Sequence, residues 1–370
     1  MASIASKAVS ADLAVKLLLC GFLNARATAE SLHLQISSLE EILANHGLHD
    51  TAMVPYHVDR YLNTTFIDLG RSSFALPCFD DDIQYSLLKK RRTEPLTFSL
   101  RPGEILNSRP AAASNGVHGI IGHVGRCGST LLCNLLAATG GWITVKEPEI
   151  INALMLRLAN KPDERARETA SKLIAKTLQS FAHGTQRDVG EVARDCIVKL
   201  TSWNLLFAHE FLPHLSDTPI VILTRDPCET VASSLDQLPG WVTQGSSSTD
   251  IPDRIRMAQF FAAEWSLIVE AALCLPGRLL FVHYENLIEN PIIVLDRIIR
   301  HFGHFKGIPL AANTSEVMQR YSKGSVYETF EPQGKHGRIS LEQEVRDLVS
   351  SITDQSLAKL RRRLKLDSDK

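Results

Sequence analysis

The sequence has no surplus of either charge. Its 40 lysine and arginine residues face 41 aspartate and glutamate residues, which gives the 370-residue chain a formal net charge of -1. Such a balance provides no general attraction for nucleic acid or for an anionic membrane surface. Any anion that the protein binds must therefore be held by a local site. We expect a small-molecule partner, with no nucleic acid and no membrane involved.

The cysteines show no pairing pattern. The chain has seven, none of them in a C-x-x-C motif: Cys20, Cys78, Cys127, Cys133, Cys196, Cys228 and Cys274. This scatter argues against a zinc site and against a disulfide framework, and it favours a reducing compartment. Long apolar runs are also scarce. The longest uncharged run, residues 127–145, contains two glycines and several polar residues, which predicts a buried helix and strand instead of a membrane span.

The N-terminal segment lacks a clear small-residue cleavage site after its apolar patch at residues 18–23. Asp12 and Lys16 interrupt its apolar pattern, so we interpret the segment as an amphipathic helix and expect a cytoplasmic protein. The first residues are nevertheless rich in serine and alanine and free of acid. An organelle transit peptide is therefore the alternative.

The sequence pattern changes near residue 116. Residues 1–115 contain two helical patterns, followed by irregular sequence with several prolines and two strand-like pieces, TFIDL and TFSL. The stretch RPAAASNG, residues 109–116, has the composition of a linker. We interpret residues 1–115 as an N-terminal extension and residues 116–370 as an α/β domain.

Apolar segments alternate with helical ones in that domain. Strands are predicted at residues 117–124, 142–145, 196–200, 219–225 and 278–285. Helices are predicted at residues 162–181, 203–212, 253–275 and 341–364. Strands that are apolar along their whole length and alternate with helices predict a parallel sheet that is covered on both faces.

A glycine-rich turn follows the first of these strands, in GHVGRCGSTLLCNLL. Gly125 and Gly128 lie between the strand and a helix predicted to begin at Ser129, so several backbone N–H groups would point at one spot and favour a phosphate. An ATPase phosphate loop has a lysine before its hydroxyl residue, whereas this turn has Gly128 there and only Arg126 as a cation. This difference weakens a magnesium–nucleotide interpretation. A closely packed turn that binds nothing is the alternative.

A second stretch of this kind is TRDPCETVASSL. Arg225 ends an apolar strand, Pro227 suits the start of a helix, and Ser233 follows eight residues after Arg225. Together the arginine and the serine could hold a second phosphate. An arginine after a strand is as often solvated or paired with a carboxylate.

These stretches resemble the sulfotransferases that use 3'-phosphoadenosine-5'-phosphosulfate (PAPS). The family's 5'-phosphosulfate loop is matched by Gly125, Arg126, Cys127, Gly128, Ser129 and Thr130, and its 3'-phosphate pair by Arg225 and Ser233. A further family-like phrase runs from Tyr284 to Pro291, YENLIENP. The resemblance covers about residues 117–303. It implies a three-layer P-loop-type core with a central parallel sheet flanked by helices.

The resemblance also implies catalytic residues. Arg126 would stabilise negative charge, and Lys199 lies where cytosolic members place a lysine two residues before their catalytic histidine, although Thr201 stands at the histidine position. Other branches use a glutamate after the loop, and Glu147 lies where such a base would be, with Glu149 as a nearby alternative. A carboxylate at residue 147 could instead serve the dipole of the following helix.

The family's basic C-terminal loop has no clear copy, and Lys335 and Arg338 could substitute for it over the 3'-phosphate. The implied activity is sulfuryl transfer from PAPS, without a metal, to a hydroxyl or to an amine or guanidine nitrogen of a small-molecule acceptor. The N-terminal extension would form a lid or part of the acceptor pocket. A P-loop small-molecule kinase and a non-catalytic nucleotide-binding protein of the same fold are the alternatives.

Overall fold

The computed structural model describes most of the chain: residues 11–20, 22, 25–45, 53–69, 74, 76, 78–89, 96–108, 117–160, 163–186, 195–215, 218–239, 253–303, 310–319 and 341–368. The chain forms two compact units. The first comprises residues 1–118 and 147–197, and the second comprises residues 119–146 and 198–370. A separate domain that begins at residue 116 stays a prediction.

The predicted parallel sheet is confirmed, with all five predicted strands in it. Its order is β5 (Trp142–Lys146), β6 (Asp195–Lys199), β4 (Gly119–His123), β7 (Ile220–Thr224) and β8 (Leu279–His283). Of the five strands of this sheet, β4 comes first along the chain, and it lies in the middle of the sheet, with β6 on one side and β7 on the other. In such open sheets ligands bind beyond the carboxyl ends of the strands where the strand order reverses. The topology places that point at the loop after β4.

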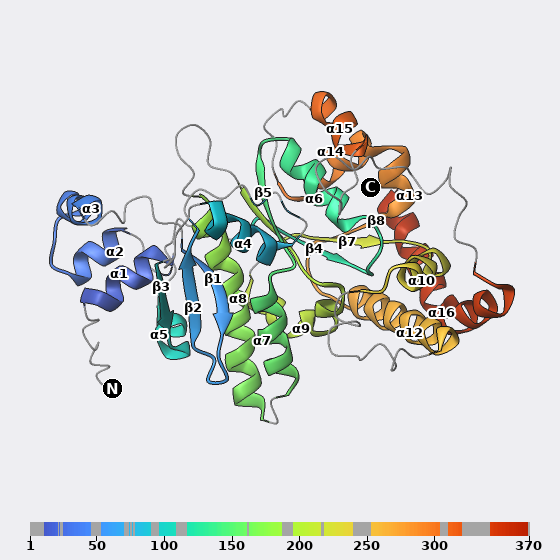
Figure 1. Cartoon of the computed structure of the whole chain (residues 1–370), viewed down its shortest axis with the longest axis horizontal. Coiled ribbons are helices and arrows are strands. Elements are labelled where there is room, and N and C mark those ends of the chain that lie inside the picture. Colours follow the sequence, from blue (N-terminus) through green and yellow to red (C-terminus); the bar gives the residue numbers. More distant parts are fainter. Residues whose placement is uncertain are drawn as a thin grey trace. The chain divides into compact units, whose positions relative to one another are not determined.

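Helices cover the sheet strands within the second unit. Figure 1 draws α6 (Ser129–Ala138), α14 (Pro291–His301) and α15 (Leu310–Gln319) above the sheet, and α10 (Pro227–Asp236), α12 (Arg254–Leu273) and α16 (Gln343–Ser368) below it. The lower three share one apolar cluster, which includes Val231, Phe261 and Val349. The strands are apolar on both faces because both faces are covered: every residue of β4, β5 and β7 is buried.

The helix predicted at residues 203–212 is wrong in type. The chain there forms two 3₁₀ turns, η1 (Ser202–Phe207) and η2 (Leu212–His214), around one short α-helical turn, α9 (Ala208–Phe211). Asn204 Oδ1 accepts from the backbone N–H of Thr201 at 3.1 Å, and this local contact fixes the start of η1 directly after β6. Short 3₁₀ segments are common as connectors of this kind. The predicted strand at residues 278–285 also ends earlier, because α13 begins at Tyr284 and ends at Glu289.

The first unit contains an antiparallel sheet, β1 (Met53–Val58), β2 (Thr64–Asp68) and β3 (Thr97–Leu100), in that order. The two strand-like pieces of the sequence are β2 and β3. The helices of this unit are α1 (Ala11–Leu19), α2 (Ala25–Ser31), α3 (Ile36–Asn45), α4 (Phe79–Lys89), α5 (Pro102–Asn107), α7 (Glu149–Ala159) and α8 (Glu164–Gln186).

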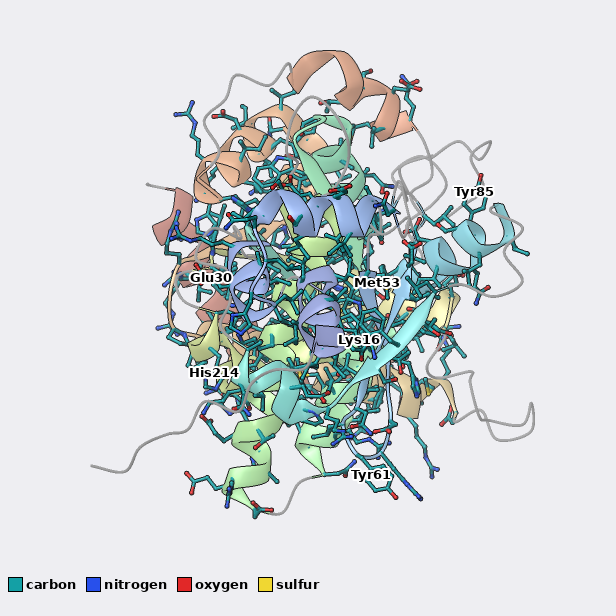
Figure 2. The ribbon with its side chains drawn as sticks, turned by 90° about the vertical axis from the view of Figure 1, so that its left-hand side faces the viewer. Lys16, Glu30, Met53, Tyr61, Tyr85 and His214 are labelled. Atoms are coloured by element: carbon teal, nitrogen blue, oxygen red, sulfur yellow. The ribbon has the colours of Figure 1, made fainter. Side chains whose placement is uncertain are left out.

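Aromatic contacts join the parts of the first unit. The ring of Phe66 on β2 contacts Phe22 at 5.8 Å between centroids, and Phe79 of α4 contacts Phe181 of α8 at 5.1 Å. Figure 2 shows Tyr61 at the β1–β2 turn and Tyr85 on α4, both of them exposed. None of the helices in the described part of the chain combines the length and the apolar character needed to span a bilayer.

Candidate active site

The loop after β4 has the backbone that a tight strand-to-helix turn requires. Gly125 and Gly128 have φ values of 79° and 78°, and Arg126 between them has a φ of 45°. A side chain at Gly128 would bring its Cβ to 2.8 Å from the ring of Tyr284, so a glycine is needed there for space as well as for backbone conformation. The turn leads directly into α6 at Ser129, whose N-terminus suits an anion.

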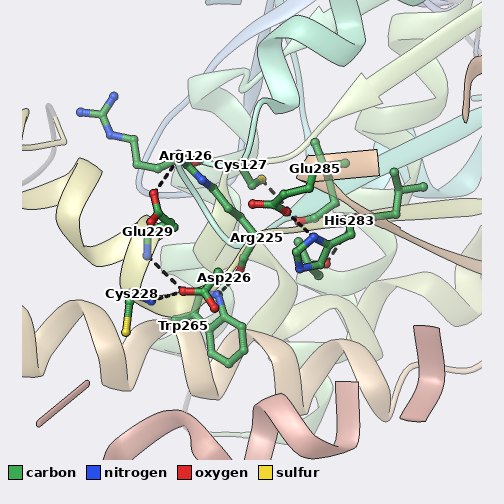
Figure 3. A network of polar contacts seen from close by, with 12 residues as sticks. Arg126, Cys127, Arg225, Asp226, Cys228, Glu229, Trp265, His283 and Glu285 are labelled. Carbon is green, nitrogen blue, oxygen red and sulfur yellow. Dashed lines mark hydrogen bonds and ion pairs between the residues drawn. The ribbon is translucent and has the colours of Figure 1, made fainter. Parts of the chain in front are cut away.

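The two predicted phosphate-binding arginines are connected through the loop backbone. Arg225 Nη1 donates to the carbonyl oxygen of Arg126 at 3.0 Å (Figure 3). The guanidinium of Arg126 itself donates to Gln237, with 3.1 Å from Nη1 to Oε1 and a second bond from Nη2 to the Gln237 carbonyl oxygen. Arg126 is thus held at the C-terminal end of α10, and Arg225 fixes the loop that carries it.

Arg225 is almost completely buried, with 7% of its surface exposed. Its guanidinium carbon lies 4.6 Å from the ring centroid of Tyr284, and Nη2 lies 3.4 Å from Oε2 of Glu229 on α10. Its carbonyl oxygen accepts from Trp265 Nε1 of α12 at 3.1 Å. Tyr284 therefore packs against both the loop glycine and the arginine, which makes it a structural link between the two predicted phosphate sites.

The helix after Arg225 is set by a side-chain cap. Asp226 Oδ1 accepts from the backbone N–H groups of Cys228 and Glu229 at 2.9 and 3.3 Å, and Pro227 occupies the first helical turn. This cap orients α10 from the carboxyl end of β7. Ser233 lies on α10, the helix that follows Arg225, and is half-buried.

Lys199 reaches the loop from the end of β6. Its Nζ donates to Oγ1 of Thr130 at 3.0 Å, and both residues are buried. Burial of an ammonium group is costly unless an opposite charge or hydrogen bonds compensate it. A positive charge beside the first turn of α6 adds to the attraction of this end of the helix for an anion.

Cys127 contributes backbone to the loop and not a reactive thiol. Burial raises the pKa of its thiol to about 11, although the charges of Lys199 and Arg225 act in the opposite direction. Its Sγ lies 3.4 Å from the carbonyl oxygen of Leu223, toward which the thiol can donate. A thiol that stays protonated at neutral pH is a poor nucleophile.

The comparison with known families gives a match across this site. The model of the Sulfotransferase family matches residues 120–304, which is half of the chain. The chain belongs to the sulfotransferase family. No curated protein matches it.

Several solved sulfotransferase structures are similar to this family member at low identity. The sulfotransferase domain from the curacin biosynthetic pathway is 16% identical, with a TM-score of 0.41, over 65% of this chain and 96% of that one. Sulfotransferase STF9 from Mycobacterium avium is 12% identical, with a TM-score of 0.42, over 75% of this chain and 83% of its own. Mouse sulfotransferase SULT7A1, in complex with PAP, is 13% identical, with a TM-score of 0.35, over 70% of this chain and 97% of its own.

Glu147, the carboxylate that the sulfotransferase resemblance assigns as base, belongs to the first unit, between β5 and α7. It is half-buried and has a φ of 51°, a rare value for a residue other than glycine. The alternative, Glu149, is exposed, and its backbone N–H donates to Oδ2 of Asp80 at 3.2 Å. The catalytic role of Glu147 stays a prediction.

The remaining predicted residues of this family member are the two proposed to substitute for the family's basic C-terminal loop. Lys335 and Arg338 lie outside the described residues. The described residues contain no group of three or more histidine, cysteine, aspartate or glutamate side chains placed to hold a metal ion.

Sequence reasoning missed two residues that the structure places at the loop. Tyr284 opens the quoted YENLIENP phrase, so the motif itself could have drawn attention to it. Gln237, which binds Arg126, had no signal because its role depends on where α10 ends.

Proposed function

We propose that the protein transfers a sulfuryl group from PAPS to a hydroxyl, or to an amine or guanidine nitrogen, of a small-molecule acceptor. Membership of the sulfotransferase family supports sulfuryl transfer in general. The observation that carries the more specific donor is the bond between Arg225 and the Arg126 backbone at the point where the strand order reverses. It links two cationic groups that suit the two separate phosphate positions of PAPS.

In this proposal the loop holds the 5'-phosphosulfate. The backbone N–H groups of residues 125–130 and the N-terminus of α6 face the anion, and Arg126 leaves Gln237 to bind the sulfuryl oxygens. Arg225 and Ser233 hold the 3'-phosphate, and Lys335 and Arg338 close over it. Arg225 is suited to this task because Tyr284 and Glu229 fix its guanidinium before the nucleotide arrives.

The transfer itself is an in-line displacement at sulfur. The acceptor atom forms a bond to sulfur, and the bond between sulfur and the bridging phosphate oxygen breaks, which leaves 3'-phosphoadenosine-5'-phosphate (PAP). Lys199, held at Thr130, stabilises the charge that develops on the leaving phosphate. Glu147 is the base that the family resemblance suggests for the acceptor proton. No metal is needed for these steps.

Two further expectations belong to the same proposal. Residues 1–115 would form a lid or part of the acceptor pocket for the domain at residues 116–370. The protein would work in the cytoplasm, as the pattern of its N-terminal segment indicates.

Calorimetric titration with PAP, and separately with ATP and magnesium, tests the donor. We expect metal-independent binding of PAP that falls by about 10- to 150-fold in Arg225→Ala, because a charged hydrogen-bonding group contributes about 1.5–3 kcal/mol. Arg225→Lys keeps the positive charge but loses the paired N–H groups of the guanidinium, so its affinity for PAP should lie between those of the wild type and Arg225→Ala.

Arg300→Ala is the matched control, since Arg300 is an exposed residue paired with Asp296 on α14. It should bind PAP like the wild type. Preference for magnesium–ATP would support the kinase alternative instead. PAP binding without turnover of PAPS with any acceptor would support the non-catalytic alternative.

A further inference from the structure

One carboxylate of the second unit lies beside the loop and takes no part in the site described so far. Glu264 is on α12, half-buried, and hydrogen-bonds to the side chain of Ser202. Ser202 is the first residue of η1, which follows β6 after Leu200 and Thr201. A Cβ built on Gly125 of the loop would lie 3.9 Å from both Cβ and Oγ of Ser202. The partner of Glu264 therefore lies close to the loop.

The neighbours of Glu264 along α12 are tied to the same place. Trp265 Nε1 donates to the carbonyl oxygen of Arg225 at 3.1 Å, so the helix is fixed to the end of β7 at the next residue. Glu264 thus lies on a helix that contacts the residues following both β6 and β7, the two neighbours of β4 in the sheet. The carboxyl ends of these strands form the edge of the sheet at which the proposed transfer would take place.

The charge state of Glu264 suits a proton acceptor. Burial raises the pKa of its carboxyl to about 7, and the hydrogen bond from Ser202 lowers it by less. A general base works best when its pKa lies near the operating pH. The residue at the family's histidine position, Thr201, cannot take this role because its hydroxyl is not basic at neutral pH.

Two charged residues on the helices packed against α12 are paired with residues other than Glu264. η1 has no titratable side chain. On α10, Glu229 is paired with Arg225 at 3.4 Å, and on α16, Lys359 Nζ lies 2.9 Å from Glu270. The upward shift of the Glu264 pKa therefore follows from burial and not from a neighbouring carboxylate.

We propose that Glu264, oriented by Ser202, accepts the proton that the acceptor loses during sulfuryl transfer. The inference rests on the proposed function and gives the base a place other than Glu147. As the acceptor oxygen or nitrogen bonds to sulfur and the phosphate oxygen leaves with the electron pair of the broken bond, the acceptor proton passes to a carboxylate oxygen of Glu264. Solvent then takes it up, since the side chain is only half-buried.

The first test is a carboxyl ¹³C NMR titration of the protein labelled at glutamate, with and without PAP. The resonance that disappears in Glu264→Gln should titrate near neutral pH. Binding of PAP should move its midpoint upward by at least about half a pH unit, because nearby phosphate charge disfavours the carboxylate. Glu270, on the same helix but paired with Lys359, should not respond to PAP.

The NMR result separates the two hypotheses. If PAP binds in calorimetry and the Glu264 midpoint does not move, the inference is wrong and the proposed function stands. If PAP does not bind at all, the proposed function fails first, whatever the midpoint of Glu264.

The second test is transfer from PAPS to two probe acceptors, 2-naphthol, which stays protonated at the assay pH, and a nitrophenol that is already ionised. Glu264→Gln should lower kcat with 2-naphthol by about 100- to 10,000-fold and with the nitrophenol far less. The rise of the wild-type rate with pH through about 7 should also vanish in the variant. Ser202→Ala should shift this rise to higher pH, because it removes the bond that lowers the pKa of Glu264.

Glu270→Gln is the control for the substitution itself and should keep the wild-type pH profile. Glu147→Gln is the decisive comparison. If that variant loses the pH-dependent rise while Glu264→Gln keeps it, Glu147 is the base and the inference is overturned. If the wild type sulfates neither probe, the NMR titration alone decides.

Discussion

Replacement of Glu264 by glutamine should stabilise the protein by an amount that grows as pH rises from 4.5 to about 7 and is complete above it. The carboxyl has a pKa of about 7 in the folded protein, against an ordinary value of 4.5 for a glutamate, and burial is the cause. Between these values the folded state binds more protons than the unfolded state, so stability falls as pH rises through this range. Glutamine cannot ionise, and it keeps an oxygen that can accept from Ser202.

The size of the effect follows from the shift. Each pKa unit is worth about 1.4 kcal/mol, so the full shift sets an upper limit of about 3 kcal/mol for the cost of the ionised carboxylate. Partial exposure of the side chain reduces this, and we expect Glu264→Gln to raise the free energy of unfolding by about 1–2 kcal/mol at pH 8. At pH 4, where the carboxyl is protonated in both states, the gain should disappear.

Urea unfolding followed by tryptophan fluorescence measures this gain. Three of the four tryptophans are described residues of the second unit: Trp142, Trp203 and Trp265. The signal therefore reports on the unit that contains α12. Glu270→Gln gives the opposite sign, because Lys359 and Ser356 lower the pKa of Glu270 and its ionised form stabilises the fold. Equal gains of Glu264→Gln at pH 4 and pH 8, or no gain at either, would refute the assignment of a buried, weakly acidic carboxyl.

Two further predictions concern the loop. Gly128→Ala should destabilise the second unit by about 1–3 kcal/mol and abolish PAP binding, because the added Cβ would meet the ring of Tyr284 at 2.8 Å and the residue has a φ of 78°. Urea unfolding measures the loss of stability and calorimetry measures the loss of binding. Wild-type PAP affinity in the variant would contradict the prediction. Cys127 should react with iodoacetamide at pH 8 far more slowly than the exposed Cys274, because burial raises the pKa of the Cys127 thiol to about 11. Peptide mass spectrometry gives the two rates. Equal rates would show that the Cys127 thiol is accessible.

The sheet could be predicted from the sequence because its strands are apolar along their whole length. This pattern arises when both faces of a parallel sheet are covered, and all five predicted strands are present. The segment at residues 203–212 was predicted as α-helix and forms mainly 3₁₀ turns, because apolar spacing alone does not distinguish the two over so short a length. The antiparallel sheet of the first unit was only partly visible, since just β2 and β3 have strand-like sequence.

The loop could be predicted for a different reason. Its glycines, Arg126 and the hydroxyl residues are consecutive, so the sequence contains the whole turn, and the same is true of Arg225 and the cap of α10. The contacts that give these residues a common site are not local. Arg225 bonds to the backbone of residue 126 across 99 positions, and Lys199 reaches Thr130 across 69.

The sequence by itself determined the succession of strands and helices along the chain, the turn after β4 and the arginine after β7. Each of these depends on neighbouring residues and on backbone preferences. Only the tertiary structure decided that Tyr284 packs against both Gly128 and Arg225, and that Glu264 meets Ser202 beside the loop. A glutamate on a helix has no sequence signal for a raised pKa. Its acidity is set by burial, and burial exists only once distant segments have packed together.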